Sequence, residues 1–222
     1  MRIKTTLVSG VVKEIKPNIY GVIIPDDYER AMLFCRYQEY YESPYREIRS
    51  KFFTLEDFMN LYRKKRKNKV FQYPNDWAGF NIPSHIIMSA FDTFGQNLNN
   101  YDLIMKEILY YCEGQSNGNP YYLIGVDKQK SKTMNHEIAH GLYYTNKAYK
   151  TKVDELISNI PKNEYNLVKK ELLNLGYVNK KSIIDDEIQA FFSTGLYFKF
   201  NNEIIRSHTP PFILNFKSYV RS

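Results

Sequence analysis

The sequence predicts an α+β fold that is mostly helical and carries a small mixed sheet. Apolar residues recur with helical spacing over most of the chain, whereas β-rich segments are confined to the N-terminal end and to one stretch near the middle. A chain of 222 residues, with 43% hydrophobic and 25% charged residues, can bury a substantial core. We expect a single domain with an N-terminal lobe over residues 1–110 and a second lobe over residues 111–222.

The N-terminal lobe is expected to begin with a β-hairpin. Residues 6–16 and 19–24 are β-rich and alternate between apolar and polar side chains, and Pro17-Asn18 between them favours a turn. Residues 75–83 hold the only tryptophan, a glycine and a proline, and we interpret them as a structured loop. Helices are expected over residues 26–41, from residue 54 into a basic run at 63–69, and over 84–94 and 100–112.

In the second lobe, a strand over residues 121–126 is expected to precede a series of helices. Met134, Ile138 and Leu142 follow the strand at positions i, i+4 and i+8, which predicts the apolar face of a helix. Further helices are expected over residues 148–159, 162–175 and 183–192.

The helix with this apolar face also carries the sequence His136-Glu137-Ile138-Ala139-His140, which fits the pattern H-E-x-x-H. Residues four apart on a helix leave the same face, so both imidazoles can bind one zinc ion. The glutamate beside the first histidine can act as the general base that takes a proton from a zinc-bound water. The alternative interpretation is a helix that carries two exposed histidines.

A third ligand is expected, because a catalytic zinc usually takes three protein ligands and keeps one position for water. Tyr143 and Asn146 stand where an H-x-x-G-x-x-H continuation would need glycine and histidine, which excludes that type of site. Glu187 lies at the centre of the apolar face of the 183–192 helix, where an ionised carboxylate is costly unless it is paired or bound to metal. We predict that Glu187 is the third ligand. A salt bridge to a buried Lys or Arg is the alternative.

These segments resemble the zincin metallopeptidases of the gluzincin type, in which a downstream glutamate completes the H-E-x-x-H site. The stretch from Glu187 to Phe191, E-x-x-A-F, is similar to the third-ligand segment of lethal-factor-type proteases. The resemblance covers these two short segments. It implies a zincin-like fold with the sheet next to the motif helix, one Zn²⁺ per chain and hydrolysis of a peptide or protein substrate. It also implies an edge strand that binds the substrate by strand addition.

Several polar residues within and near the 183–192 helix are candidates for supporting roles. Ser182 followed by Asp185 resembles a capping box, and Asp185 and Asp186 in a first helical turn would favour the helix dipole. Alternatively, one of the two aspartates orients a ligand histidine through its second ring nitrogen. Tyr177 and His208 flank this helix in the sequence and are the candidates for stabilising the oxyanion of the tetrahedral intermediate.

Charge and composition limit the other functions. Much of the net charge of +7 sits in the run from Arg63 to Lys69, which is more often a solvated helix end than a binding surface. No RNA- or DNA-binding signature accompanies it, so we do not expect a nucleic-acid partner. The chain has no apolar run of 18 residues or more and lacks the apolar core of a signal peptide. Cys35 and Cys112 are consistent with reduced thiols, and we expect a cytoplasmic protein.

The sequence therefore predicts a zinc-dependent metallopeptidase with Glu137 as general base. Three alternatives remain open at this point. They are a catalytically inactive zincin-fold binding module, a basic nucleic-acid-binding protein, and a zinc amidohydrolase that cuts a bond outside proteins. The presence of Glu137 favours an active enzyme, because an inactive copy often loses this residue.

Overall fold

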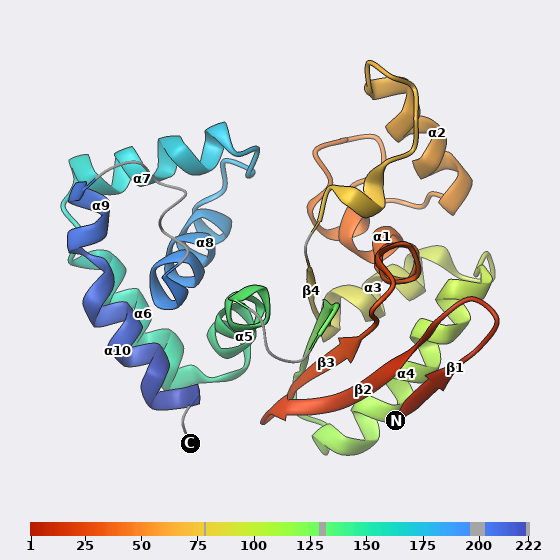
Figure 1. Ribbon diagram of the computed structural model, residues 1–222, viewed down its shortest axis with the longest axis horizontal. Coiled ribbons are helices and arrows are strands. Elements are labelled where there is room, and N and C mark those ends of the chain that lie inside the picture. Colours follow the sequence, from red (N-terminus) through yellow and green to blue (C-terminus); the bar gives the residue numbers. More distant parts are fainter. Residues whose placement is uncertain (78, 129–131, 196–202, 221–222) are drawn as a thin grey trace. The chain divides into compact units, whose positions relative to one another are not determined.

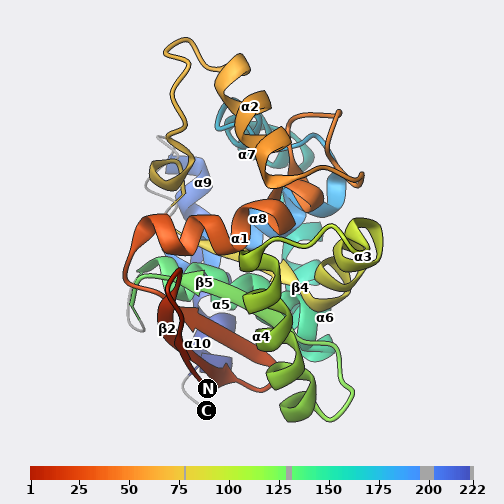
Figure 2. The ribbon, with the colours of Figure 1, turned by 90° about the vertical axis from the view of Figure 1, so that its right-hand side faces the viewer.

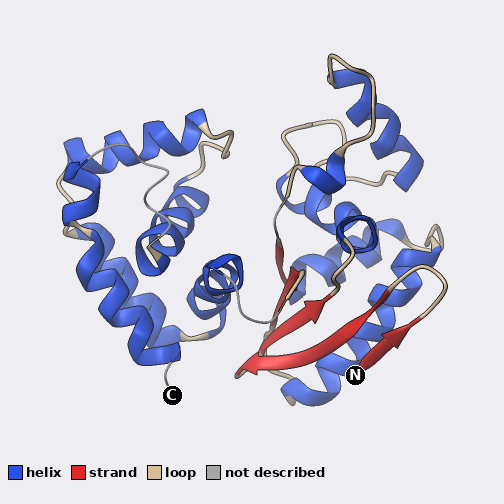
Figure 3. Cartoon of the chain, in the orientation of Figure 1, coloured by secondary structure: helices blue, strands red, loops and turns tan. Residues whose placement is uncertain are grey.

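The computed structural model describes residues 1–77, 79–128, 132–195 and 203–220. The chain forms two compact units, Met1–Gln129 and Lys130–Ser222. All strands among the described residues lie in the first unit, and the regular elements described in the second unit are all helices (Figure 3). The expected fold class, α+β and mostly helical with a small mixed sheet, is confirmed. The division between the units follows the last strand, so the described residues 111–128 fall in the same unit as the sheet.

The sheet of the first unit has five strands in the order β1-β2-β3-β5-β4. They are β1 (Arg2–Lys4), β2 (Ser9–Lys16), β3 (Ile19–Ile23), β4 (Phe80–Pro83) and β5 (Tyr122–Val126). The predicted hairpin is formed by β2 and β3, and Asn18 in its turn has a positive φ of 60°. β3 pairs with β5 in parallel and the other pairs are antiparallel, so the sheet is mixed.

The interpretation of residues 75–83 as a loop is wrong over its second half. Phe80–Pro83 form β4, which pairs antiparallel with β5 and is one edge of the sheet. A proline is tolerated at the end of such a strand, because an edge strand does not need to pair every backbone N–H. The first half overlaps a short 3-10 helix, η1 (Tyr73–Asn75). The predicted strand at 121–126 is the interior strand β5.

Three helices of the first unit cover one face of its sheet (Figure 2). The sheet is covered by α1 (Asp27–Glu42), α3 (Ser84–Phe94) and α4 (Asn100–Ser116), and α2 (Leu55–Lys65) follows α1. The helix starts agree with the sequence prediction because capping residues mark them: Asp26 caps α1, and Thr54 and Asp57 form a capping box on α2. Gly125 lets α1 approach β5, since a Cβ there would lie 2.6 Å from the ring of Phe34.

The second unit packs around α8 (Figure 1). Its helices are α5 (Lys132–Thr145), α6 (Lys147–Ser158), α7 (Lys162–Asn174), α8 (Lys181–Thr194), α9 (Glu203–Ser207) and α10 (Thr209–Val220). Helix α8 contacts α5, α6, α7 and α10, which makes it the central helix of this unit. The helices expected over 148–159, 162–175 and 183–192 are confirmed as α6, α7 and α8. Within the described part of the chain, no helix combines the length and the apolar character that crossing a bilayer requires.

Candidate metal centre

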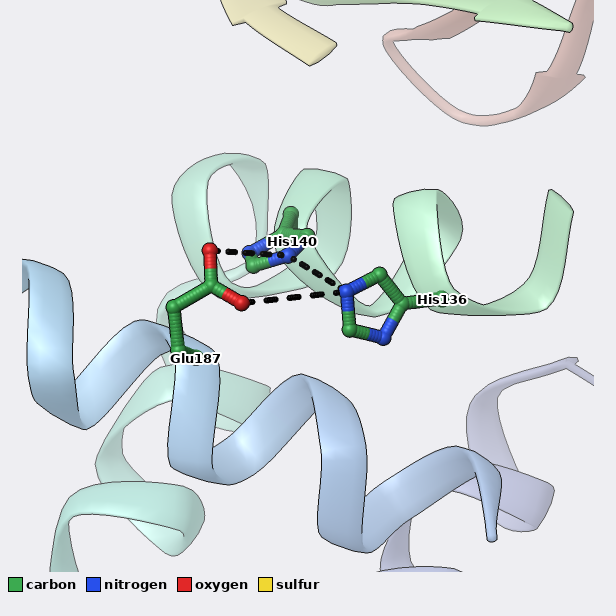
Figure 4. A group of neighbouring side chains, drawn as sticks. All are labelled: His136, His140 and Glu187. Atoms are coloured by element: carbon green, nitrogen blue, oxygen red, sulfur yellow. Dashed lines mark hydrogen bonds and ion pairs between the residues drawn. The ribbon is translucent and has the colours of Figure 1, made fainter. Parts of the chain in front are cut away.

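Two helices of the second unit bring the three predicted metal ligands together. His136 and His140 on α5 face Glu187 on α8 (Figure 4). One nitrogen or oxygen atom of each residue lies within 4.8 Å of the corresponding atoms of the other two. The three residues are buried, with exposed fractions of 9%, 2% and 7%. The alternative of two exposed histidines is therefore wrong.

Apolar side chains of α5 and α8 hold the two helices in the unit around this group. Met134, Ile138 and Leu142 of α5 are all buried, as the i, i+4, i+8 spacing predicts. On α8, Ile184 and Ile188 are fully buried on either side of Glu187. His136 and His140 leave α5 on the side opposite to its apolar stripe. The stripe therefore buries one side of the helix, while the side that carries the histidines meets Glu187 on α8, which packs against α5.

The distances within the group suit a small tetrahedral metal ion. The Nε2 atoms of His136 and His140 are 3.3 Å apart. Glu187 Oε1 lies 3.7 Å from Nε2 of His140, and Glu187 Oε2 lies 3.8 Å from Nε2 of His136. Ligand atoms on a tetrahedral zinc with bonds of about 2.0–2.1 Å are separated by about 3.3–3.4 Å. The two nitrogens already have this separation, and two imidazoles with a carboxylate are a common catalytic zinc set.

Asp186 contacts the ring nitrogen of His140 that points away from the group. Asp186 Oδ1 lies 2.9 Å from Nδ1 of His140. Of the two interpretations of the aspartates, the structure therefore agrees with the one in which an aspartate orients a ligand histidine. The capping interpretation is wrong, because α8 begins at Lys181 and its N-cap residue, Lys180, makes no side-chain capping bond. Asp185 instead accepts a hydrogen bond of 2.7 Å from Tyr165 and pairs with Lys181.

These carboxylates change the protonation of His140. Burial lowers the pKa of the His140 imidazole, but the negative charges of Asp186, Glu187 and Glu137 outweigh burial and raise the pKa to about 10. In the metal-free protein, the ring is therefore an imidazolium ion at neutral pH. A metal ion that binds to Nε2 must displace one proton.

A titration of the metal-free protein, followed through the histidine NMR signals, is expected to show this shift. His140 should stay protonated up to a pH of about 10, whereas His85 should titrate below its ordinary value because burial lowers its pKa. Because the pKa of His140 is higher in the folded protein than in the unfolded chain, its protonation stabilises the fold. This contribution is fully present below about pH 6.5 and is lost as the pH rises through about 10. The melting temperature should fall over the same window. A His140 signal that titrates below pH 7 would contradict the assignment.

The remaining predicted site residues lie at different distances from this group. Glu137 is buried, with 5% of its surface exposed, and is near enough to contribute to the raised pKa of His140. The ring of Phe191 packs 4.7 Å from the ring of His136, and Tyr177 packs edge-on against Phe191. Tyr177 is thus one aromatic ring removed from His136. His208 is paired through Nε2 with Glu164 on α7 and is not a member of the group.

The chain was compared with protein families, curated proteins and solved structures. None of these comparisons found a match. The assignment of the site therefore depends on the geometry of its own residues. Sequence reasoning missed Tyr149 and Gln189, which lie behind Asp186 and are fully buried. The available signal was a row of polar residues on α8, since Gln189 lies one turn after Asp186 and one turn before Ser193.

Proposed function

We propose that this chain is a zinc-dependent metallopeptidase of the gluzincin type, with His136, His140 and Glu187 as the metal ligands. The observation that supports this most directly is the convergence of three buried ligand atoms from two helices. The H-E-x-x-H pattern alone accounts for two of them. The third, Glu187, was predicted on separate grounds, because it places a charge on an apolar helix face.

Glu137 is the proposed general base. Zinc at such a site lowers the pKa of a bound water towards neutrality and polarises a carbonyl oxygen. The carboxylate of Glu137 would accept the proton of the attacking water and then deliver it to the leaving amine. Tyr177 is the better of the two oxyanion donors, because it packs against Phe191 beside His136, whereas His208 is held by Glu164. A peptide or protein substrate, the absence of a nucleic-acid partner and a cytoplasmic location are parts of the same proposal.

Metal content is the first test of this proposal. Protein purified without chelator is expected to hold about one zinc per chain, bound through nitrogen and oxygen atoms at about 2.0–2.2 Å. Elemental analysis gives the stoichiometry and X-ray absorption spectroscopy gives the ligand distances. Protein that is free of metal, and that binds no zinc in a titration, would refute the proposal. Cleavage profiling on a proteome-derived peptide library then tests whether the zinc-loaded protein hydrolyses peptide bonds.

The basic run is expected to matter little for this function. Arg63, Lys64 and Lys65 form the last turn of α2, where positive charges suit the helix dipole, and Lys65 also lies 3.3 Å from Glu47. Replacing Lys64, Lys65 and Lys67 together by glutamine should leave zinc content and the rate of peptide hydrolysis unchanged. Polynucleotide binding that depends strongly on salt, and that the triple variant abolishes, would favour the nucleic-acid-binding alternative instead.

A further inference from the structure

A chain of polar contacts runs from His140 into the interior of the second unit. Asp186 Oδ1, which lies 2.9 Å from His140 Nδ1, also accepts a hydrogen bond of 2.9 Å from Nε2 of Gln189. The side-chain oxygen of Gln189 accepts a 2.9 Å hydrogen bond from the hydroxyl of Tyr149 on α6. That hydroxyl is also 3.2 Å from Oγ of Ser193, one turn further along α8. The contacts thus connect α5, α8 and α6.

These contacts lie where polar groups are expensive. Gln189 and Tyr149 have no exposed surface, and Ser193 is 2% exposed. A buried amide or hydroxyl destabilises a fold unless its hydrogen bonds are made, and apolar side chains of similar size would fill the same space at lower cost. Each member here has its partner, and the series ends at a predicted metal ligand. We therefore ask what this series of hydrogen bonds does for His140.

We propose that Asp186, held in place by Gln189 and Tyr149, is a positioning residue that prepares His140 to bind the metal. The inference rests on the proposed function, since it assumes that His140 Nε2 is a metal ligand. An imidazole that binds metal through Nε2 carries its proton on Nδ1. A carboxylate oxygen that forms an ion pair 2.9 Å from Nδ1 is near enough to accept that proton, which would favour this tautomer and limit rotation of the ring.

Gln189 and Tyr149 determine the orientation of this carboxylate. The hydroxyl of Tyr149 donates to the amide oxygen of Gln189, so the amide NH₂ group is directed to Asp186. The carboxylate therefore keeps one oxygen in front of His140. Loss of a residue should matter less with each step away from the ring, because each more distant partner acts only through the one before it.

Zinc affinity, measured by competition with a chromophoric chelator, tests this order. Asp186→Ala should weaken zinc binding by about 10–100-fold, the usual effect of losing such a partner. Asp186→Asn keeps an acceptor oxygen and should recover part of the loss. Gln189→Met and Tyr149→Phe keep the packing and remove one polar group each, so their losses should be smaller, in that order. Melting of the metal-free variants checks that the fold is retained.

Asp185→Asn is the matched control. Asp185 is the adjacent aspartate and is more deeply buried than Asp186, with 11% against 27% of its side chain exposed, but it contacts Tyr165 and Lys181 and not a histidine. Its substitution removes the same charge from the same helix and should leave zinc affinity within about twofold of the wild type. The zinc-loaded wild type should also show a slowly exchanging imidazole N–H proton for His140 in NMR spectra. This signal should disappear in Asp186→Ala and persist in Asp185→Asn.

Three results would overturn the inference. Equal zinc affinity in Asp186→Ala and the wild type would show that Asp186 does not position the ligand. Equal losses in Asp185→Asn and Asp186→Asn would show that the effect is one of general charge. In both cases the proposed function stands, because the wild type binds zinc. If the wild type binds no zinc at all, the proposed function fails and this inference fails with it.

Discussion

Replacing Glu137 by glutamine is expected to lower the rate of peptide hydrolysis by about 10²–10⁴-fold, which is the usual contribution of a general base. Glutamine has nearly the same shape but cannot accept a proton at neutral pH. Because Glu137 is not one of the three grouped ligands, the variant should still bind zinc as the wild type does. The measurements are the turnover of peptides found by cleavage profiling and the zinc content of both proteins.

Glu155→Gln is a suitable control for this variant. Glu155 is a solvent-exposed glutamate on α6 of the same unit. The ion pair described for its side chain is with Lys152, on the same helix. Its substitution should change neither turnover nor zinc content. If Glu137→Gln hydrolyses the same peptides at close to the wild-type rate, Glu137 is not the base. Loss of activity together with loss of zinc would instead assign it a structural role.

Replacing Glu187 by alanine is expected to weaken zinc binding by more than about 100-fold, because even partners behind a ligand are worth about 10–100-fold. The two carboxylate oxygens of Glu187 lie 3.7 and 3.8 Å from the Nε2 atoms of the two histidines. Glu187 is the one carboxylate of the group, so the histidines cannot supply the oxygen ligand in its place. Glu187→Gln keeps one neutral oxygen at the site and should bind zinc with intermediate affinity. Chelator competition ranks the three proteins.

Glu164→Ala provides the comparison for Glu187. Glu164 also faces a histidine in the second unit, but its partner is His208, outside the metal group. Zinc affinity should not change in this variant. The salt-bridge alternative for Glu187 predicts a different pattern. In that case Glu187→Ala would lower the melting temperature while zinc remained bound with wild-type affinity.

The helices were predictable where capping residues and apolar spacing coincide. Asp26 and Thr54 mark helix starts in the sequence, and they cap α1 and α2 in the structure. β4 could not be predicted in the same way, because a strand of four residues has too little alternation and its proline indicates a loop. Helix α10 was missed because Pro210 and Pro211 also indicate a break. They lie in its first turn, where the backbone N–H groups have no partner within the helix.

The candidate site was predictable only where the sequence pattern lies within one helix. The spacing of His136 and His140 follows from helical geometry within one segment, and Glu187 was marked by a charge on an apolar face. The contact between Asp186 and His140 depends on how α8 is rotated against α5. That rotation is set by the packing of all the helices around α8, and no local pattern encodes it.

The position of Glu187 on the central helix of the second unit has a consequence for the lifetime of the protein in a cell. An ion that binds the native site, and not the unfolded chain, stabilises the native state by mass action, by about 4 kcal/mol at a free concentration 1,000 times its dissociation constant. Here that ion would join α5 to the helix against which α6, α7 and α10 also pack. Zinc supply would then set how often this unit opens to cellular proteases, and starvation for the metal would remove the protein as well as its chemistry.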